Sequence, residues 1–93
     1  MSRPKKPRNI GFEPGVTYFK PRGIPLFQLS EVELGMDEIE AIRLKDVRDL
    51  DQVVCAKKMK ISQSTFQRIL DLAHQKVAQA LISGQAIKII EKK

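Results

Sequence analysis

Residues 56–70, AKKMKISQSTFQRIL, decide the fold of this chain because they combine two helical segments with a short turn. Two helices that cross steeply with few residues between them need a small residue at the crossing and apolar residues in the wedge between them. Ala56 is the small residue. The apolar residues at the wedge positions are Met59, Ile61, Phe66 and Ile69. An arbitrary amphipathic pair would often match fewer positions, so the pattern predicts a helix-turn-helix.

The turn contains one unexpected residue, Lys60. Glycine is favoured at this position because the backbone takes a left-handed conformation, which costs a residue with a side chain roughly 1 kcal/mol. Ser62 is well suited to cap the N-terminus of the second helix. We therefore expect a left-handed turn at Lys60 that the wedge residues and the Ser62 cap hold in place.

The exposed residues at the start of the second helix are suited to reading DNA in the major groove. Glutamine pairs with two edge atoms of adenine and arginine with two of guanine, and each pair gives roughly 1–3 kcal/mol of base discrimination. Threonine near a helix start is placed to bond a phosphate. The predicted recognition residues are Gln63, Ser64, Thr65, Gln67 and Arg68, with Asp71 one turn further. The alternative is an ordinary solvated helix face.

Basic residues near this face are expected to attract the DNA backbone independently of base sequence. The lysines beside the turn are Lys57, Lys58 and Lys60. The N-terminal stretch MSRPKKPR is an extended, proline-punctuated arm that carries Arg3, Lys5, Lys6 and Arg8. Such an arm can lie in a minor groove or along phosphates. A solubilising tail without a fixed partner is the alternative, and Lys20 and Arg22 are secondary candidates.

Helix signals also precede the motif. Asp37 is expected to cap a helix, with Glu40 reaching back to it. The apolar side of that helix is expected to contain Ile39, Ala41, Ile42 and Val47. A break near residues 49–50 is followed by Asp51, a second expected N-cap. The acidic residues of this region are interpreted as capping and helix-dipole charges, not as a metal or acid–base site.

The last helix is predicted to be the longest. Its apolar residues recur at three- and four-residue spacings: Phe66, Ile69, Leu70, Ala73, Val77, Ala80 and Leu81. Gly84 is expected to end it in a left-handed cap. Residues 86–90, AIKII, are expected to form a short strand or a packed tail.

The N-terminal third reads differently, because prolines and glycines interrupt it. Only VTYFK, residues 16–20, is suited to a short strand. The predicted fold is a mainly α helix-turn-helix domain of three or more helices over residues 31–93. Residues 1–30 are predicted to be a basic arm and an irregular Pro/Gly-rich extension of the same folding unit.

The composition excludes several classes of protein. The chain has 93 residues, of which 42% are hydrophobic and 30% charged, as in a globular domain. No apolar run reaches the length of a membrane span, so we expect a cytoplasmic protein. Cys55 and His74 are the only residues of their types, and no cysteine–histidine zinc cluster, catalytic constellation or cofactor motif is visible. Cys55 is expected to be a buried core residue, and His74 a surface or interface histidine.

Charge is divided into three blocks along the chain. Residues 1–22 carry a balance of +5, residues 23–56 a balance of −5 and residues 57–93 a balance of +6, which gives a net charge of +6. Two basic segments that flank an acidic one are typical of a chain whose ends face a polyanion. Simple solvation of a small surface is the alternative for the net charge alone.

The sequence also resembles known families. Residues 37–81 resemble the fourth, helix-turn-helix region of bacterial sigma factors. RPKKPR, FEPGVTYFKPRGIPL, DEIEAIRLKD and STFQRIL together resemble a family of small prokaryotic proteins of unknown function, described as predicted DNA-binding proteins. The resemblance implies a sigma-like helix-turn-helix fold and a regulatory role. Some relatives carry a cysteine near the position of Gly11, and since this chain does not, no cysteine-based metal or redox site is implied.

We therefore expect a non-enzymatic, sequence-specific DNA-binding protein that regulates transcription. Because one short helix reads a single half-site with modest affinity, we expect a homodimer. The last helix and AIKII are the candidate interfaces. A protein–protein adaptor with the same fold is the alternative, and binding of structured RNA is a weaker one because interleaved stacking aromatics are absent from the sequence.

Overall fold

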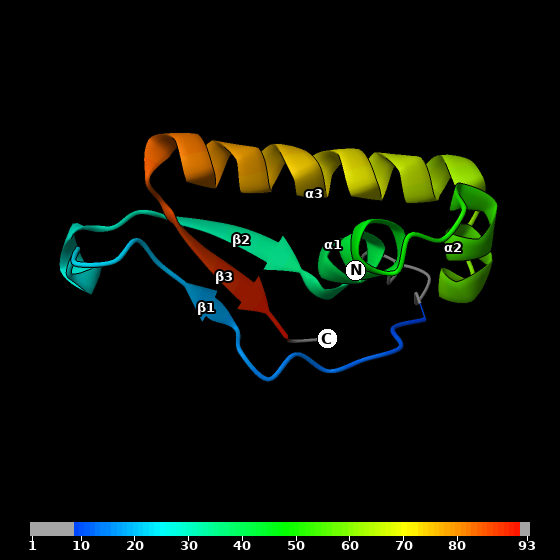
Figure 1. The fold of residues 1–93 in the computed structure, drawn as a ribbon, viewed down its shortest axis with the longest axis horizontal. Helices are drawn as coiled ribbons and strands as arrows, with labels where there is room; N and C mark the ends of the chain where they lie inside the picture. Colours follow the sequence, from blue (N-terminus) through cyan, green and yellow to red (C-terminus); the bar gives the residue numbers. More distant parts are fainter. Residues whose placement is uncertain (1–8, 92–93) are drawn as a thin grey trace, which may run out of the picture.

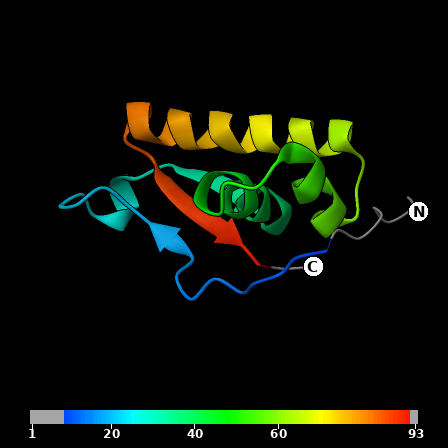
Figure 2. The ribbon, with the colours of Figure 1, turned by 45° about the vertical axis from the view of Figure 1, so that its right-hand side comes forward.

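The computed structural model describes residues 9–91. The elements in chain order are β1 (Tyr18–Phe19), a 3-10 turn η1 (Leu26–Gln28), β2 (Glu31–Gly35), α1 (Met36–Ile42), a π-helical turn η2 (Arg43–Val47), α2 (Gln52–Met59), α3 (Gln63–Ser83) and β3 (Ala86–Ile90). In Figures 1 and 2, α3 extends along one side of the molecule, above the sheet and α1, and α2 lies at the end where α3 begins. The segment that leads to β1 runs along the opposite side.

The three strands form one sheet in the order β1-β3-β2. β3 is parallel to β2 and antiparallel to β1. Alternate side chains of β2 and β3 point to α3, so Leu34 and Ile89 are buried against Ala73. The predicted short strand within residues 16–20 is confirmed as β1, and residues 86–90 form a strand. The expectation of a mainly α domain is incomplete, because β2 was not predicted.

α1 begins earlier than the sequence predicts. Gly35 occupies the N-cap position, and the Glu38 carboxylate accepts a hydrogen bond from the Gly35 N–H at 2.9 Å. Asp37 lies in the first turn, so the predicted capping pair of Asp37 and Glu40 is wrong. Glu40 is instead buried and forms an ion pair with Arg43. Gly35 takes the N-cap position in place of Asp37 because β2 runs directly into α1 and places Gly35 at their junction.

The helix continues beyond α1 as the π-helical turn η2 and ends near Asp49, which has a positive φ of 57°. Val47 is 75% exposed, so its predicted place on the apolar side is wrong. The wider turn interrupts the α-helical repeat, and Leu44 is the buried residue of this segment. Asp51 is confirmed as the N-cap residue of α2, although among residues 9–91 its side chain makes no capping hydrogen bond.

The predicted wedge between α2 and α3 is confirmed. The two helices are joined by residues 60–62 and share one apolar cluster. Its buried members from the predicted set are Ala56, Met59, Phe66 and Ile69, and Ile61 is packed against them. Burial on the inner side therefore fixes how α3 is rotated about its own axis, and with it which residues face outward.

The ends of α3 also agree with the sequence. Lys60 has φ 59° and ψ 45°, the predicted left-handed conformation. The Ser62 hydroxyl accepts a hydrogen bond from the Thr65 N–H at 3.1 Å and so caps α3. Gly84 ends the helix with φ 68°. Only Leu81 departs from the predicted apolar face, since it is 74% exposed.

Candidate nucleic-acid interface

The predicted recognition residues lie together at the start of α3. Gln63, Ser64, Gln67 and Arg68 are exposed, while Thr65 is half-buried beside the Ser62 cap. The wedge residues of the same helix point the other way, into the core. The start of α3 thus combines a rigidly packed inner side with a polar outer side.

Four of the predicted recognition side chains have partners on the protein surface. The Ser64 and Thr65 hydroxyls lie 3.3 Å and 2.9 Å from the Ser62 hydroxyl. Gln63 Nε2 donates to Gln52 Oε1 at 3.3 Å, and Gln67 Nε2 donates to Asp71 Oδ1 at 2.7 Å. Both glutamine contacts are exposed, so water or a ligand can replace them at small cost. Arg68 has no hydrogen-bond or ion-pair partner among residues 9–91. These groups are available to a partner molecule that approaches α3 from outside.

Arg68 borders a cleft of about 700 Å³ between the start of α3, the start of α1 and β2. Four carboxylates also line this cleft: Glu33, Asp37, Glu38 and Asp71. Arg68 and Lys76 are the cations in this lining, and Lys76 is paired with Glu38. Because the carboxylates outnumber the cations and repel phosphates, this cleft is poorly suited to lie against a DNA backbone.

A second surface, at the end of α2, is basic. Lys57, Lys58 and Lys60 are exposed beside the turn, as predicted from the sequence. Together with Arg43 and Arg48 they line a second cleft of about 460 Å³, the basic cleft. The predicted arm residues Arg3, Lys5, Lys6 and Arg8 lie outside the described residues. Lys20 and Arg22 lie near β1, in the extension before β2.

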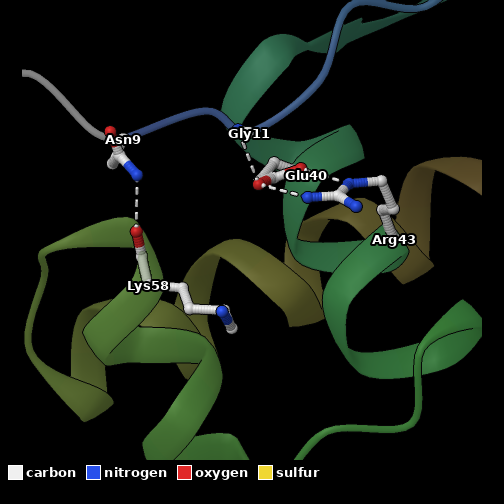
Figure 3. A network of polar contacts seen from close by, with 5 residues as sticks. All are labelled: Asn9, Gly11, Glu40, Arg43 and Lys58. Carbon is white, nitrogen blue, oxygen red and sulfur yellow. Dashed lines mark hydrogen bonds and ion pairs between the residues drawn. The ribbon is translucent and has the colours of Figure 1, made fainter.

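The N-terminal segment of the described chain is attached to the end of α2 at Asn9 (Figure 3). The Asn9 N–H donates to the carbonyl of Met59 at 3.0 Å, and Asn9 Nδ2 donates to the carbonyl of Lys58 at 2.9 Å. The last carbonyls of α2 lack partners within the helix, so Asn9 acts as an external cap for them. Asn9 is thereby attached directly beside the turn.

A buried ion pair continues this attachment (Figure 3). Glu40 accepts hydrogen bonds from the Gly11 N–H at 2.9 Å and from Arg43 Nε at 2.7 Å. The guanidinium of Arg43 lies over the Phe12 ring at 4.9 Å, and its bond to Glu40 raises its pKa, so it stays charged. A Cβ on residue 11 would lie 3.0 Å from Arg43 Nη2. Because Gly11 has no side chain, its backbone can lie this close to the ion pair. Sequence reasoning missed this network, because its partners are separated by 29 and 49 positions.

The other residues singled out from the sequence belong to the core and surface. Cys55 is buried as predicted, and burial raises the pKa of its thiol. His74 Nε2 lies 2.6 Å from Asp46 Oδ2, a carboxylate partner that the sequence did not indicate. Within residues 9–91 no three histidine, cysteine or acidic side chains are grouped to hold a metal ion. Nor is any helix in this range both long and apolar enough to cross a membrane.

Fold and surface together define a small mixed α/β protein with three exposed lysines, Lys57, Lys58 and Lys60, around the turn between α2 and α3. The chain belongs to the family described as "Protein of unknown function DUF134", which matches residues 1–92. The expected membership in a family of small prokaryotic proteins is confirmed.

The chain is similar to several proteins named UPF0251 protein. One from Desulforudis audaxviator is 56% identical over 89 residues, which cover 96% of this chain and 58% of that protein. One from Caldanaerobacter subterraneus is 55% identical, with 96% of this chain and 75% of that protein covered. One from Halothermothrix orenii is 50% identical over 88 residues, which cover 95% of this chain and 65% of that protein. The chain thus spans roughly 58–75% of the length of these relatives. No solved structure matches it significantly.

Proposed function

We propose that this protein binds double-stranded DNA sequence-specifically through a sigma-factor-like helix-turn-helix made of α2, residues 60–62 and α3. In this role it regulates transcription and is not an enzyme. The observation that carries the proposal is the two-sided start of α3, with wedge residues buried inside and amides and a guanidinium exposed outside. A helix held in this way enters a major groove as a rigid unit.

The charged side chains near the turn suggest how the duplex is oriented. Gln63, Gln67 and Arg68 would face base edges, while Lys57 and Lys60 at the end of α2 would face phosphates. Asn9 is attached to the same end of α2.

We also propose a homodimer, because paired half-sites raise affinity. Both edges of β3 are already paired within the chain, so AIKII does not offer a free edge. The exposed apolar residues Leu81, Ile82 and Phe19 near the end of α3 are the remaining candidate contact. Sedimentation equilibrium should give twice the chain mass, with Ile82→Lys shifting it to the monomer. A monomeric wild-type protein would contradict this part of the proposal.

The test of DNA binding is a fluorescence anisotropy titration with pools of duplexes at two salt concentrations. Gln67→Ala and Arg68→Ala should relax base preference by about 1–3 kcal/mol at single positions. Gln79→Ala, at the other end of α3, is the matched control and should change nothing. An unchanged base preference in both recognition variants would show that the start of α3 does not read bases.

A protein–protein adaptor is the second candidate, favoured by the carboxylate-lined cleft next to Arg68. Its lining carries more carboxylates than cations, which suits a basic partner segment. The adaptor predicts no duplex binding at physiological salt and a stable complex with a protein partner instead. The titration above therefore separates the two candidates.

A further inference from the structure

The basic cleft is lined by charged residues that have no part in the proposed reading of bases by α3. It lies between the N-terminal segment at Asn9 and Gly11, the π-helical turn and the end of α2, with a volume of about 460 Å³. Its charged lining residues are Glu40, Arg43, Arg48, Lys57, Lys58 and Lys60. Five cations therefore surround one carboxylate.

That carboxylate does not neutralise the cleft. Glu40 is only 2% exposed, and its two oxygens accept hydrogen bonds from the Gly11 N–H and from Arg43 Nε and Nη2. Glu40 and Arg43 thus compensate each other. The side chains of Arg48, Lys57, Lys58 and Lys60 form no ion pair with any residue in 9–91. Like charges around one cleft repel each other, and a bound anion removes this cost.

The backbone wall of the cleft and Arg43 are held in place. The carbonyls of Lys58 and Met59, which would repel an anion, already accept hydrogen bonds from Asn9. Arg43 is held between Glu40 and the Phe12 ring. Figure 3 shows Asn9 and Lys58 joined on one side and the Glu40–Arg43 pair on the other. An incoming anion would therefore meet an ordered wall, with the side chains of Arg48 and the three lysines, unpaired within residues 9–91, around it.

We propose that the basic cleft is a phosphate site, in which Arg48 and Lys58 bind a phosphate group with support from Lys57 and Lys60. The favoured source is a backbone phosphate of the DNA held on α3, because Lys60 belongs both to this cleft and to the turn that leads into α3. In this form the inference rests on the proposed function. A free phosphorylated small molecule offers the same chemistry and is the other source to be distinguished.

The test compares Arg48→Gln/Lys58→Gln with Lys45→Gln/Lys88→Gln, a control pair that removes the same charge from outside the cleft. The logarithm of the duplex association constant is measured against the logarithm of salt concentration. Each lost phosphate contact reduces the slope by about 0.9. The Arg48→Gln/Lys58→Gln variant, the cleft pair, should reduce the slope by the amount expected for roughly one to two lost phosphate contacts. It should weaken binding to all duplexes equally, while the control pair leaves the slope unchanged. Equal slopes in the two pairs would overturn the assignment to a DNA phosphate.

A second measurement, calorimetric titration with tripolyphosphate, identifies the source. If the cleft takes DNA phosphates, tripolyphosphate should bind weakly, lose affinity in the cleft pair and compete with duplex. Micromolar binding that depends on Arg48 and Lys58 without any duplex binding would support a free phosphorylated ligand and refute the proposed function. If neither slope nor tripolyphosphate binding differs from the control pair, the phosphate site is refuted, whatever Arg68→Ala does to base preference. Thermal unfolding of both pairs verifies that they fold.

Discussion

At the scale of single residues, Lys60 shows how a local rule can be broken without loss of the fold. Its left-handed backbone would suit glycine. The turn is nevertheless held by the packing of Met59 and Ile61 in the core and by the Ser62 cap of α3. The strain of roughly 1 kcal/mol is small beside the burial of the wedge residues. In return, an ammonium group lies on the rim of the basic cleft.

Lys60→Gly is expected to raise the free energy of unfolding by less than about 1 kcal/mol, because glycine relieves the strain but loses more entropy on folding. It should also weaken duplex binding at low salt, since one cation is removed. Urea unfolding and a binding titration measure the two effects. A large fall in stability would mean that the Lys60 side chain has a structural role that the left-handed turn does not explain.

At the scale of secondary-structure elements, the ion pair between Lys76 and Glu38 joins α3 to the β2–α1 junction. Lys76 Nζ lies 2.9 Å from Glu38 Oε1 and donates to the carbonyl of Glu33 at 2.8 Å. Glu38 in turn accepts from the Gly35 N–H. Two backbone groups of β2, on the edge not paired with β3, are thus occupied, which protects that edge from pairing with another chain.

Lys76→Met keeps the aliphatic stem but leaves the buried Glu38 without its cation. We expect a loss of about 1–3 kcal/mol in the free energy of unfolding, with the lower end favoured because Lys76 is partly exposed. Lys88→Met, at an exposed sheet position, is the control, and adding Glu38→Gln should restore part of the loss by removing the unpaired charge. Equal stability of Lys76→Met and the wild type would show that the pair is not structural.

The limits of prediction from sequence also appear at this scale. α3 could be predicted because its apolar repeat, its Ser62 cap and Gly84 are all local. β2 could not, because it has only five residues and its partner strand lies about 55 positions further along. The same division holds for the site. Gln63 to Arg68 follow from helical spacing, whereas Asn9 and Arg48 join the basic cleft only through contacts between distant segments.

At the scale of the whole molecule, the fold gathers residues from different charge blocks of the sequence into two clefts. The acidic block contributes Glu33, Asp37 and Glu38 to the cleft beside α3, which Arg68 and Lys76 also line. Lys57, Lys58 and Lys60 of the last block line the basic cleft together with Arg43 and Arg48 of the acidic block.

The most direct measurement of the central claim is selection of bound duplexes from a random-sequence pool, followed by sequencing. We predict that the wild type enriches a defined motif, and that Arg68→Ala and Gln67→Ala each lose preference at a different base position. Lys57→Gln should lower recovery while leaving the motif unchanged, because phosphate contacts carry no base information. Failure to enrich any motif, or the same motif in wild type and both recognition variants, would contradict base reading by α3.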